Sequence, residues 1–149
     1  MEKKKVILTL CKRFPANHPK AEKPTGFEDE LKKGTKIHTI RGNAKNVWEG
    51  RYNDIASGKK YLSVREWTGR PYNSEQREFA RFERIGLQHI TMSYCSTDEV
   101  PQVWIDDKKV PFEEVAHNDA LSEEDFISFF FQKSNVFDGV VIHFTDYRY

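Results

Sequence analysis

Apolar and polar residues alternate along much of the chain, which predicts a protein built mainly from β-strands. Strand-like runs of this kind, several of them rich in β-branched residues, occupy 6–11, 36–41, 61–67, 78–94, 100–105 and 139–144. The run at 78–94 is longer than an ordinary strand and contains Gly86. We therefore expect it to form one bent strand, or two strands that Gly86 separates. Asp106 and Asp107 follow the run at 100–105 and predict a turn there.

Shorter segments have the spacing and the end signals of helices. They are expected at about 27–33, 43–57, 111–116 and 123–132. Thr25 and Glu28 form a capping-box pattern at the start of the first helix, and Gly34 is placed to end it in the left-handed conformation. Ser122 is placed to cap the last helix.

This order of elements predicts an α+β fold, a small and mostly antiparallel β-barrel with about three or four short helices flanking it. The 149 residues fit a single domain that is large enough to bury a core. Hydrophobic residues make up 38% and charged residues 32% of the chain, which is typical of a soluble globular protein.

Charge is divided unevenly between the two halves of the chain. Residues 1–72 contain 17 Lys and Arg against 8 Asp and Glu, whereas residues 73–149 contain 7 against 15, so the net charges are +9 and −8. The basic half can form one positive face that attracts a polyanion. Alternatively, the two halves pack together and their charges cancel, and the sequence leaves both interpretations open.

Several classes of protein are disfavoured by the composition. The chain has no apolar run near the roughly 20 residues that cross a membrane, and no signal peptide is recognisable. Cys11 and Cys95 lack metal-ligand or redox spacing, so we expect two buried free thiols in the cytoplasm. His38 has no ligand-spaced histidine partner, and we expect neither a metal nor a cofactor.

The segment 34–41, with the sequence GTKIHTIR, carries the most chemical information. Gly34 allows the backbone to approach a ligand closely. Lys36 supplies a positive charge or, where it is desolvated, a base. Thr39 and Arg41 follow on the predicted strand and add a hydroxyl and a second cation. In a regular strand Lys36 and Thr39 face opposite sides, so they meet only if Lys36 precedes the pleat or a bulge intervenes.

This segment resembles the core pattern of the ASCH domain in the PUA-like superfamily, Gly-x-Lys-x-x-(Glu/Thr)-x-Arg. The resemblance includes three further stretches, which are an apolar strand ending in Arg-Phe, the residues before the last helix and the closing strand, at 7–14, 118–122 and 141–144. It implies one PUA-like domain over residues 1–149, with a subgroup insertion at about 43–75.

Some small ASCH proteins are amidohydrolases that remove the acetyl group of N4-acetylcytidine with a lysine, a threonine and a glutamate. The resemblance places these roles on Lys36, Thr39 and Asp119, the last being one methylene shorter than glutamate. Thr39 would attack the amide carbon while a neutral Lys36 takes its proton. Asp119 would position or protonate the leaving amine, and Arg41 would steady the loop or a developing oxyanion.

Our first hypothesis from the sequence is a module that binds RNA or a modified nucleotide in a basic, aromatic-lined cleft beside strand 36–41. Its expected ligand-binding residues include cations, aromatics and the glycine of the motif, namely Gly34, His38, Arg41, Arg65, Trp67 and Arg70. The alternatives are the amidohydrolase and a protein-interaction domain with a vestigial pocket. Trp48 and Trp67 are open to either a core or a base-stacking role, and the oligomeric state is open.

Overall fold

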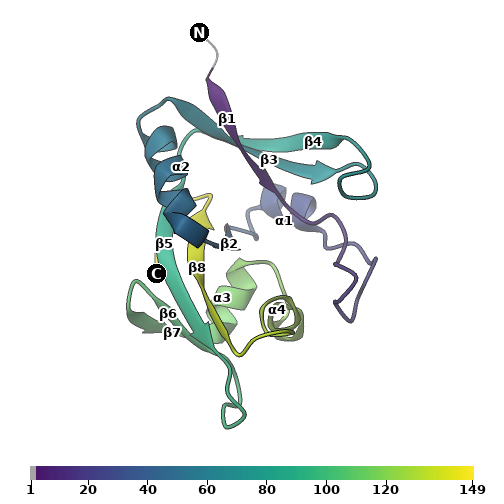
Figure 1. Ribbon diagram of the computed structural model, residues 1–149, viewed down its shortest axis with the longest axis vertical. Helices are drawn as coiled ribbons and strands as arrows, with labels where there is room; N and C mark the ends of the chain where they lie inside the picture. The colour runs from purple at the N-terminus through teal and green to yellow at the C-terminus, as the bar shows by residue number, and fades with distance from the viewer. Residues whose placement is uncertain (1–2) are drawn as a thin grey trace.

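Two β-sheets carry most of the chain in the computed structural model, which describes residues 3–149. The first sheet has the order β1-β3-β4 and comprises β1 (Lys4–Thr9), β3 (Lys60–Trp67) and β4 (Gln76–Phe82). The second has the order β2-β8-β5-β6-β7 and comprises β2 (His38–Gly42), β5 (Gly86–Ser93), β6 (Gln102–Ile105), β7 (Lys108–Val110) and β8 (Val136–His143). Figure 1 shows the first sheet across the top of the molecule and the second below it.

Short helices fill the space beside the sheets. They are α1 (Phe27–Lys33), the 3-10 turn η1 (Ala44–Asn46), α2 (Val47–Ala56), α3 (Phe112–Asn118) and α4 (Glu123–Phe130). In Figure 1, α3 and α4 lie together beside β8, and α1 lies below the first sheet. None of the helices within residues 3–149 is long and apolar enough to cross a membrane.

The α+β class and the mostly antiparallel pairing are confirmed, but the two sheets do not close into one barrel. All strand pairs are antiparallel except β1 with β3. Where β1 ends, the Arg41 side chain from β2 donates a hydrogen bond to the Thr9 carbonyl at 2.6 Å. Within residues 3–149, no strand pairing joins the two sheets at this place or elsewhere.

One hydrophobic core joins both sheets to the helices. Its most deeply buried members come from β3, β5, β6, β8, α3 and α4, and include Leu62, Val64, Ile90, Ile105, Val115, Phe126, Val141 and Ile142. Residues 43–75 take part in this core, because they supply β3, the central strand of the first sheet. Trp48 is buried in the core, whereas Trp67 is half-buried on β3.

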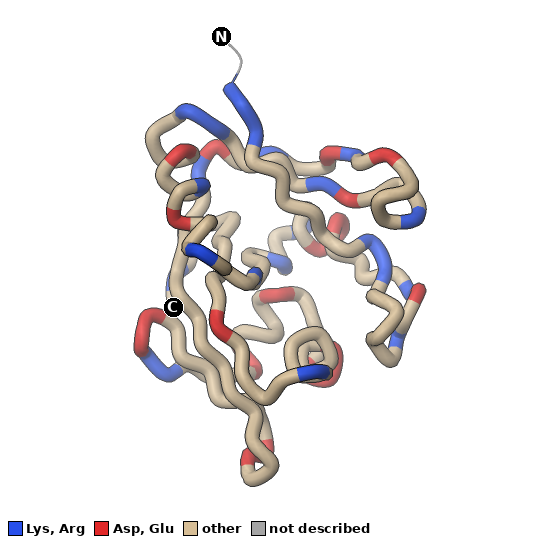
Figure 2. Tube along the Cα trace, viewed as in Figure 1, with Lys and Arg blue, Asp and Glu red and all other residues tan. Residues whose placement is uncertain are grey.

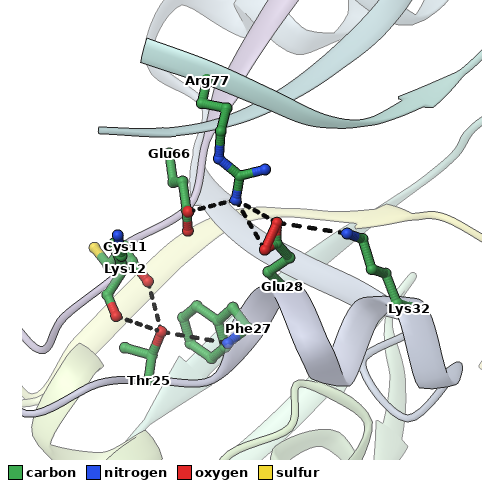
Figure 3. Close-up of polar contacts among 8 residues, drawn as sticks. All are labelled: Cys11, Lys12, Thr25, Phe27, Glu28, Lys32, Glu66 and Arg77. Atoms are coloured by element: carbon green, nitrogen blue, oxygen red, sulfur yellow. Dashed lines mark hydrogen bonds and ion pairs between the residues drawn. The ribbon is translucent and has the colours of Figure 1, made fainter. Parts of the chain in front are cut away.

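The start of α1 differs from the predicted capping box. Gly26, at φ 75°, is the N-cap, and the Thr25 hydroxyl instead donates to the Cys11 carbonyl at 2.6 Å. Glu28 does not reach back to the N-cap, because its carboxylate pairs with Arg77 of β4 (Figure 3). A tertiary ion pair and a glycine turn therefore replace the local cap.

Other local predictions are confirmed. Gly34 ends α1 at φ 82°, and the Ser122 hydroxyl accepts a hydrogen bond from the Asp125 amide at 3.1 Å. The long run divides into β4 and β5, with Gly86 as the first residue of β5. The Asp106-Asp107 turn is present, with both residues at positive φ, and it leads into β7, which the sequence analysis missed because it is only 3 residues long. Both cysteines are free, but they are exposed rather than buried as expected.

Candidate functional site

The position of Lys36 follows from the way α1 ends. The left-handed conformation of Gly34 turns the chain away from the helix, and the Lys36 amide donates to the Glu30 carbonyl at 3.1 Å. The next amide, that of Ile37, bonds to the Asn118 carbonyl at 3.0 Å, and β2 begins only at the following residue. Lys36 thus precedes the pleat, so its side chain is free of the strand alternation that would separate it from Thr39.

Lys36 and Asp119 form a buried ion pair. Only 2% of Lys36 is exposed, and its Nζ donates to Asp119 Oδ1 at 3.0 Å and to the Asp119 carbonyl at 2.9 Å. The same ammonium lies 4.1 Å from the centre of the Phe27 ring, which is a cation–π distance. Asp119 is placed there as the C-cap residue of α3. Lys36, which follows α1, and Asp119, which follows α3, therefore meet inside the molecule.

Burial and pairing act in opposite directions on these two groups. Burial lowers the pKa of Lys36 below its usual value, and the Asp119 carboxylate offsets part of this effect. Burial alone would raise the pKa of Asp119, but the positive charge of Lys36 and the contacts with His38 and Lys36 outweigh it and lower that pKa. Asp119 is therefore ionised, and Lys36 releases its proton more readily than an exposed lysine does.

Thr39 and Arg41 line the same cleft as this ion pair. The cleft has a cavity volume of about 40 Å³, and its polar lining includes Lys36, Thr39, Arg41 and Asp119. Its apolar walls come from α1, the loop before α4 and the end of α4, through Phe27, Leu121, Phe129 and Phe130. Such a volume holds a few water molecules or a small organic group.

Arg41 is held in place at the back of the cleft. Its hydrogen bond to the Thr9 carbonyl fixes the guanidinium between β2 and the end of β1. Burial lowers the pKa of Arg41, with Cys11 and Asp119 acting against the change, yet arginine remains charged in proteins. The cleft consequently contains a permanent positive charge besides Lys36.

A polar network on the other side of Asp119 includes the last residue of the chain. His38 Nδ1 lies 3.4 Å from Asp119 Oδ1, and His38 Nε2 lies 2.6 Å from the Tyr149 hydroxyl. The Asn118 side-chain amide donates to the same hydroxyl at 3.0 Å. His38 is fully buried and forms a structural layer behind the cleft rather than part of its lining.

Ion pairs hold α1, and with it the Phe27 wall, against the first sheet (Figure 3). Arg77 of β4 bonds to Glu66 of β3 at 2.7 Å and to the Glu28 carboxylate of α1, which also contacts Lys32 at 3.6 Å. The hydrogen bond from Arg77 is the main reason that the pKa of Glu28 is lowered. This network fixes one wall of the cleft to β3 and β4.

The structure brings together four predicted residues and leaves the others outside the cleft. Lys36, Thr39, Arg41 and Asp119 share the cleft lining, while Gly34 shapes the exposed turn before them. Arg65, Trp67 and Arg70 do not line it. Arg65 Nε donates to Ser63 at 2.9 Å, Trp67 packs on the Tyr72 ring at 5.1 Å between centroids, and Arg70 lies exposed in the turn after β3.

The aromatic walls and Tyr149 were not among the predicted site residues. Phe130 belongs to the apolar stripe of the last helix, and Phe129 precedes it in a run of three Phe. Both positions are equally typical of core residues, so no local signal marks them as cleft residues. Tyr149 follows the last strand, and nothing in the sequence indicates its contact with His38, 111 positions away. Within residues 3–149, no cluster of three or more metal-ligating side chains is found.

Comparisons of the chain with models of protein families, with curated proteins and with solved structures found no match.

Proposed function

We propose that the chain is a small amidohydrolase of the ASCH type, which removes the acyl group from N4-acetylcytidine or a related amide. The observation that supports this proposal is the convergence of Lys36, Thr39 and Asp119 in one cleft. A nucleic-acid surface does not require a buried lysine, because phosphate contacts are made by exposed cations. Burial suits a lysine that acts as a base in a hydrolytic site, because it lowers the pKa of the amine below its usual value.

Thr39 is the nucleophile in this proposal. Its Oγ forms a bond to the amide carbon while Lys36, in its neutral amine form, accepts the hydroxyl proton. As the carbon–nitrogen bond breaks, the Lys36 ammonium returns that proton to the leaving amine. Water then hydrolyses the Thr39 ester by the same route, which releases the acid and restores the hydroxyl. Arg41 supplies the fixed positive charge that stabilises the oxyanion in both steps.

Asp119 acts on Lys36 rather than on the substrate. Its lowered pKa keeps it ionised, so it is a poor proton donor and a good acceptor for the Lys36 ammonium. The 3.0 Å contact between Nζ and Oδ1 exists even though aspartate is shorter than the glutamate of the family pattern. The role that we assign to Asp119 is to position the base.

The size of the cleft suits an acyl group better than a whole nucleoside. A cavity of about 40 Å³ between Phe27, Phe129 and Phe130 accommodates a small group such as acetyl. The remainder of the substrate would lie at the opening of the cleft. We therefore expect the chain length of the acyl group to affect turnover more strongly than changes to the sugar.

The assay for this proposal is release of cytidine from N4-acetylcytidine, followed by chromatography. We expect turnover by the wild type and a loss of at least about 100-fold in kcat for Lys36→Arg, which keeps the charge next to Asp119 but cannot act as a base. Lys33→Arg, on the exposed last turn of α1, is the matched control and should retain full activity. Absence of turnover of every acylated nucleoside tested, or full activity of Lys36→Arg, would contradict the proposal.

A second function is supported by the turn after β3, and it is compatible with the first. The Tyr72 side chain is 87% exposed and its ring packs on Trp67, close in sequence to the exposed Arg70. Such an arrangement can stack a base of single-stranded RNA. The contact with RNA is expected to be short rather than extended, because Lys and Arg alternate with Asp and Glu around the first sheet (Figure 2).

The test of this second function is titration with a single-stranded oligonucleotide at low and high salt. We expect weak binding that decreases as salt increases and a further loss in Tyr72→Ala. Tyr147→Ala, which removes another exposed tyrosine, provides the control. No binding at low salt would exclude RNA as a ligand of this turn.

A further inference from the structure

Two buried histidines lie behind the cleft, and their hydrogen bonds determine which ring nitrogen carries the proton. His38 and His143 contact each other edge to face, with ring centres 5.7 Å apart. Both are fully buried, and in each ring Nε2 has a partner while Nδ1 has no hydrogen bond of normal geometry. The polar atom next to each Nε2 therefore determines which nitrogen of that ring carries the proton.

For His38 that atom is the Tyr149 hydroxyl, at 2.6 Å. The hydroxyl accepts a hydrogen bond from the Asn118 amide, and burial raises the pKa of Tyr149, so the hydroxyl keeps its one proton. Among the described residues, His38 Nε2 is the acceptor within reach of that proton. Donation by Tyr149 makes Nε2 of His38 the unprotonated nitrogen and leaves the ring proton on Nδ1.

The opposite tautomer of His38, with the proton on Nε2, is disfavoured by the Asp119 carboxylate on the Nδ1 side of the ring. His38 Nδ1 lies 3.4 Å from Asp119 Oδ1. An unprotonated Nδ1 would direct its lone pair at an ionised oxygen in a buried, low-dielectric environment, and this contact is repulsive. A protonated Nδ1 presents an N–H instead, and hydrogen bonds of this length in an unliganded site commonly shorten when substrate binds.

We propose that the Tyr149 hydroxyl fixes His38 in the Nδ1–H tautomer, which makes His38 the second side-chain donor to Asp119 and holds that carboxylate in place for Lys36. This inference rests on the proposed hydrolytic site for its effect on rate, but not for the tautomer itself. His38 and Tyr149 are positioning residues, because they act through Asp119 and do not line the cleft.

His143 provides an internal contrast. Its Nε2 lies 2.9 Å from Gln88 Oε1, and the Gln88 side-chain nitrogen is engaged with Asp106 at 3.0 Å, which fixes the orientation of the amide. The Tyr149 amide also donates to Gln88 Oε1, at 3.1 Å. His143 must therefore donate from Nε2, so the two neighbouring rings have opposite tautomers.

The direct test is a long-range proton–nitrogen correlation spectrum of the protein labelled with ¹⁵N-histidine, recorded where both rings are neutral. Spectra of His38→Gln and His143→Phe assign the signals. We expect the Nδ1–H pattern for His38 and the Nε2–H pattern for His143 in the wild type. Finding Nε2–H at His38 overturns the inference.

Variants at the chain end then connect the tautomer to the reaction. Tyr149→Phe removes the donor to His38 Nε2, so we expect it to increase the share of the Nε2–H form, which the Asp119 carboxylate alone then opposes. We expect the same variant to lower kcat for N4-acetylcytidine about 10-fold with little change in KM. Tyr147→Phe, which removes the hydroxyl that bonds to Glu114, should change neither. An unchanged His38 tautomer in Tyr149→Phe contradicts the inference. A wild type without activity contradicts the proposed function alone, because the spectra still decide the tautomer.

Discussion

At the scale of single residues, the buried ion pair is the feature with the largest predicted effect on stability. Lys36→Met would leave the Asp119 carboxylate buried without its main partner, so we expect a loss of about 3–5 kcal/mol in the free energy of unfolding. Replacing both residues, in Lys36→Met/Asp119→Leu, should restore much of that loss. Urea unfolding of the two variants and of the exposed control Lys33→Met measures this. A small effect of Lys36→Met alone would contradict the buried pairing.

The sequence predicted the residues of this pair but not their environment. Lys36 and Asp119 were selected by a motif and by a flanking stretch, and the structure places both in one cleft. Their near-complete burial could not be predicted, because it depends on Phe27 and on aromatic residues of α4 that arrive from distant parts of the chain. The role of Tyr149 depends in the same way on a contact between chain segments more than 100 positions apart.

At the scale of elements, the glycine that ends α1 should be sensitive to substitution. Gly34 has φ 82°, and a Cβ at this position would contact nothing within 4 Å, so the cost of Gly34→Ala is that of the backbone conformation alone. We expect a loss of about 1 kcal/mol. Gly50→Ala, inside α2 and equally free of contacts, should instead stabilise the protein by about 0.5–1 kcal/mol. Thermal unfolding of both variants measures these opposite changes in stability. Equal changes in the two variants would contradict the special backbone role of Gly34.

Most elements were predictable because their signals are local. Gly34 and Ser122 end and begin helices as their residue types indicate, and the bounds of α1 agree with the sequence pattern. The capping box failed because Glu28 has a stronger partner in Arg77, which lies 49 positions away. The predicted closed barrel is wrong because no strand pairing joins the two sheets within residues 3–149, and the end of β1 meets β2 through a side chain, that of Arg41.

At the scale of the whole molecule, acid should destabilise the fold over a defined pH range. Burial, with smaller effects of His38 and Arg148, lowers the pKa of His143 from 6.5 to about 3. The unfolded chain therefore binds this proton near pH 6.5, whereas the folded chain resists it until about pH 3. Above pH 6.5 His143 is neutral in both the folded and the unfolded chain and does not oppose folding. As the pH falls from 6.5 toward 3, protonation of the unfolded chain decreases the free energy of unfolding.

Urea midpoints measured across this range test the assignment. We expect His143→Phe to have a flatter pH dependence than the wild type, because the variant has no buried imidazole to protonate. His117→Phe, which changes an exposed histidine on α3, should follow the wild-type curve. Parallel curves for the wild type and His143→Phe would show that another group controls the acid range.

The distribution of charge over the whole molecule follows from contacts between the two halves of the chain. The basic first half and the acidic second half are joined by ion pairs, which include Lys3 with Glu83, Lys20 with Asp125 and Lys36 with Asp119. These contacts support the interpretation in which the two halves pack together and their charges cancel. They also explain why the site is better described as a small buried cleft than as an extended basic face.

Turnover of N4-acetylcytidine by variants of Thr39 tests the proposed hydrolytic site of Thr39, Lys36 and Asp119 most directly. We predict that Thr39→Val, which keeps the shape of the side chain, lowers kcat by at least about 100-fold and that Thr39→Ser retains measurable activity. Thr91→Val, on β5 and outside the cleft lining, should behave as the wild type. Wild-type turnover by Thr39→Val would contradict the account.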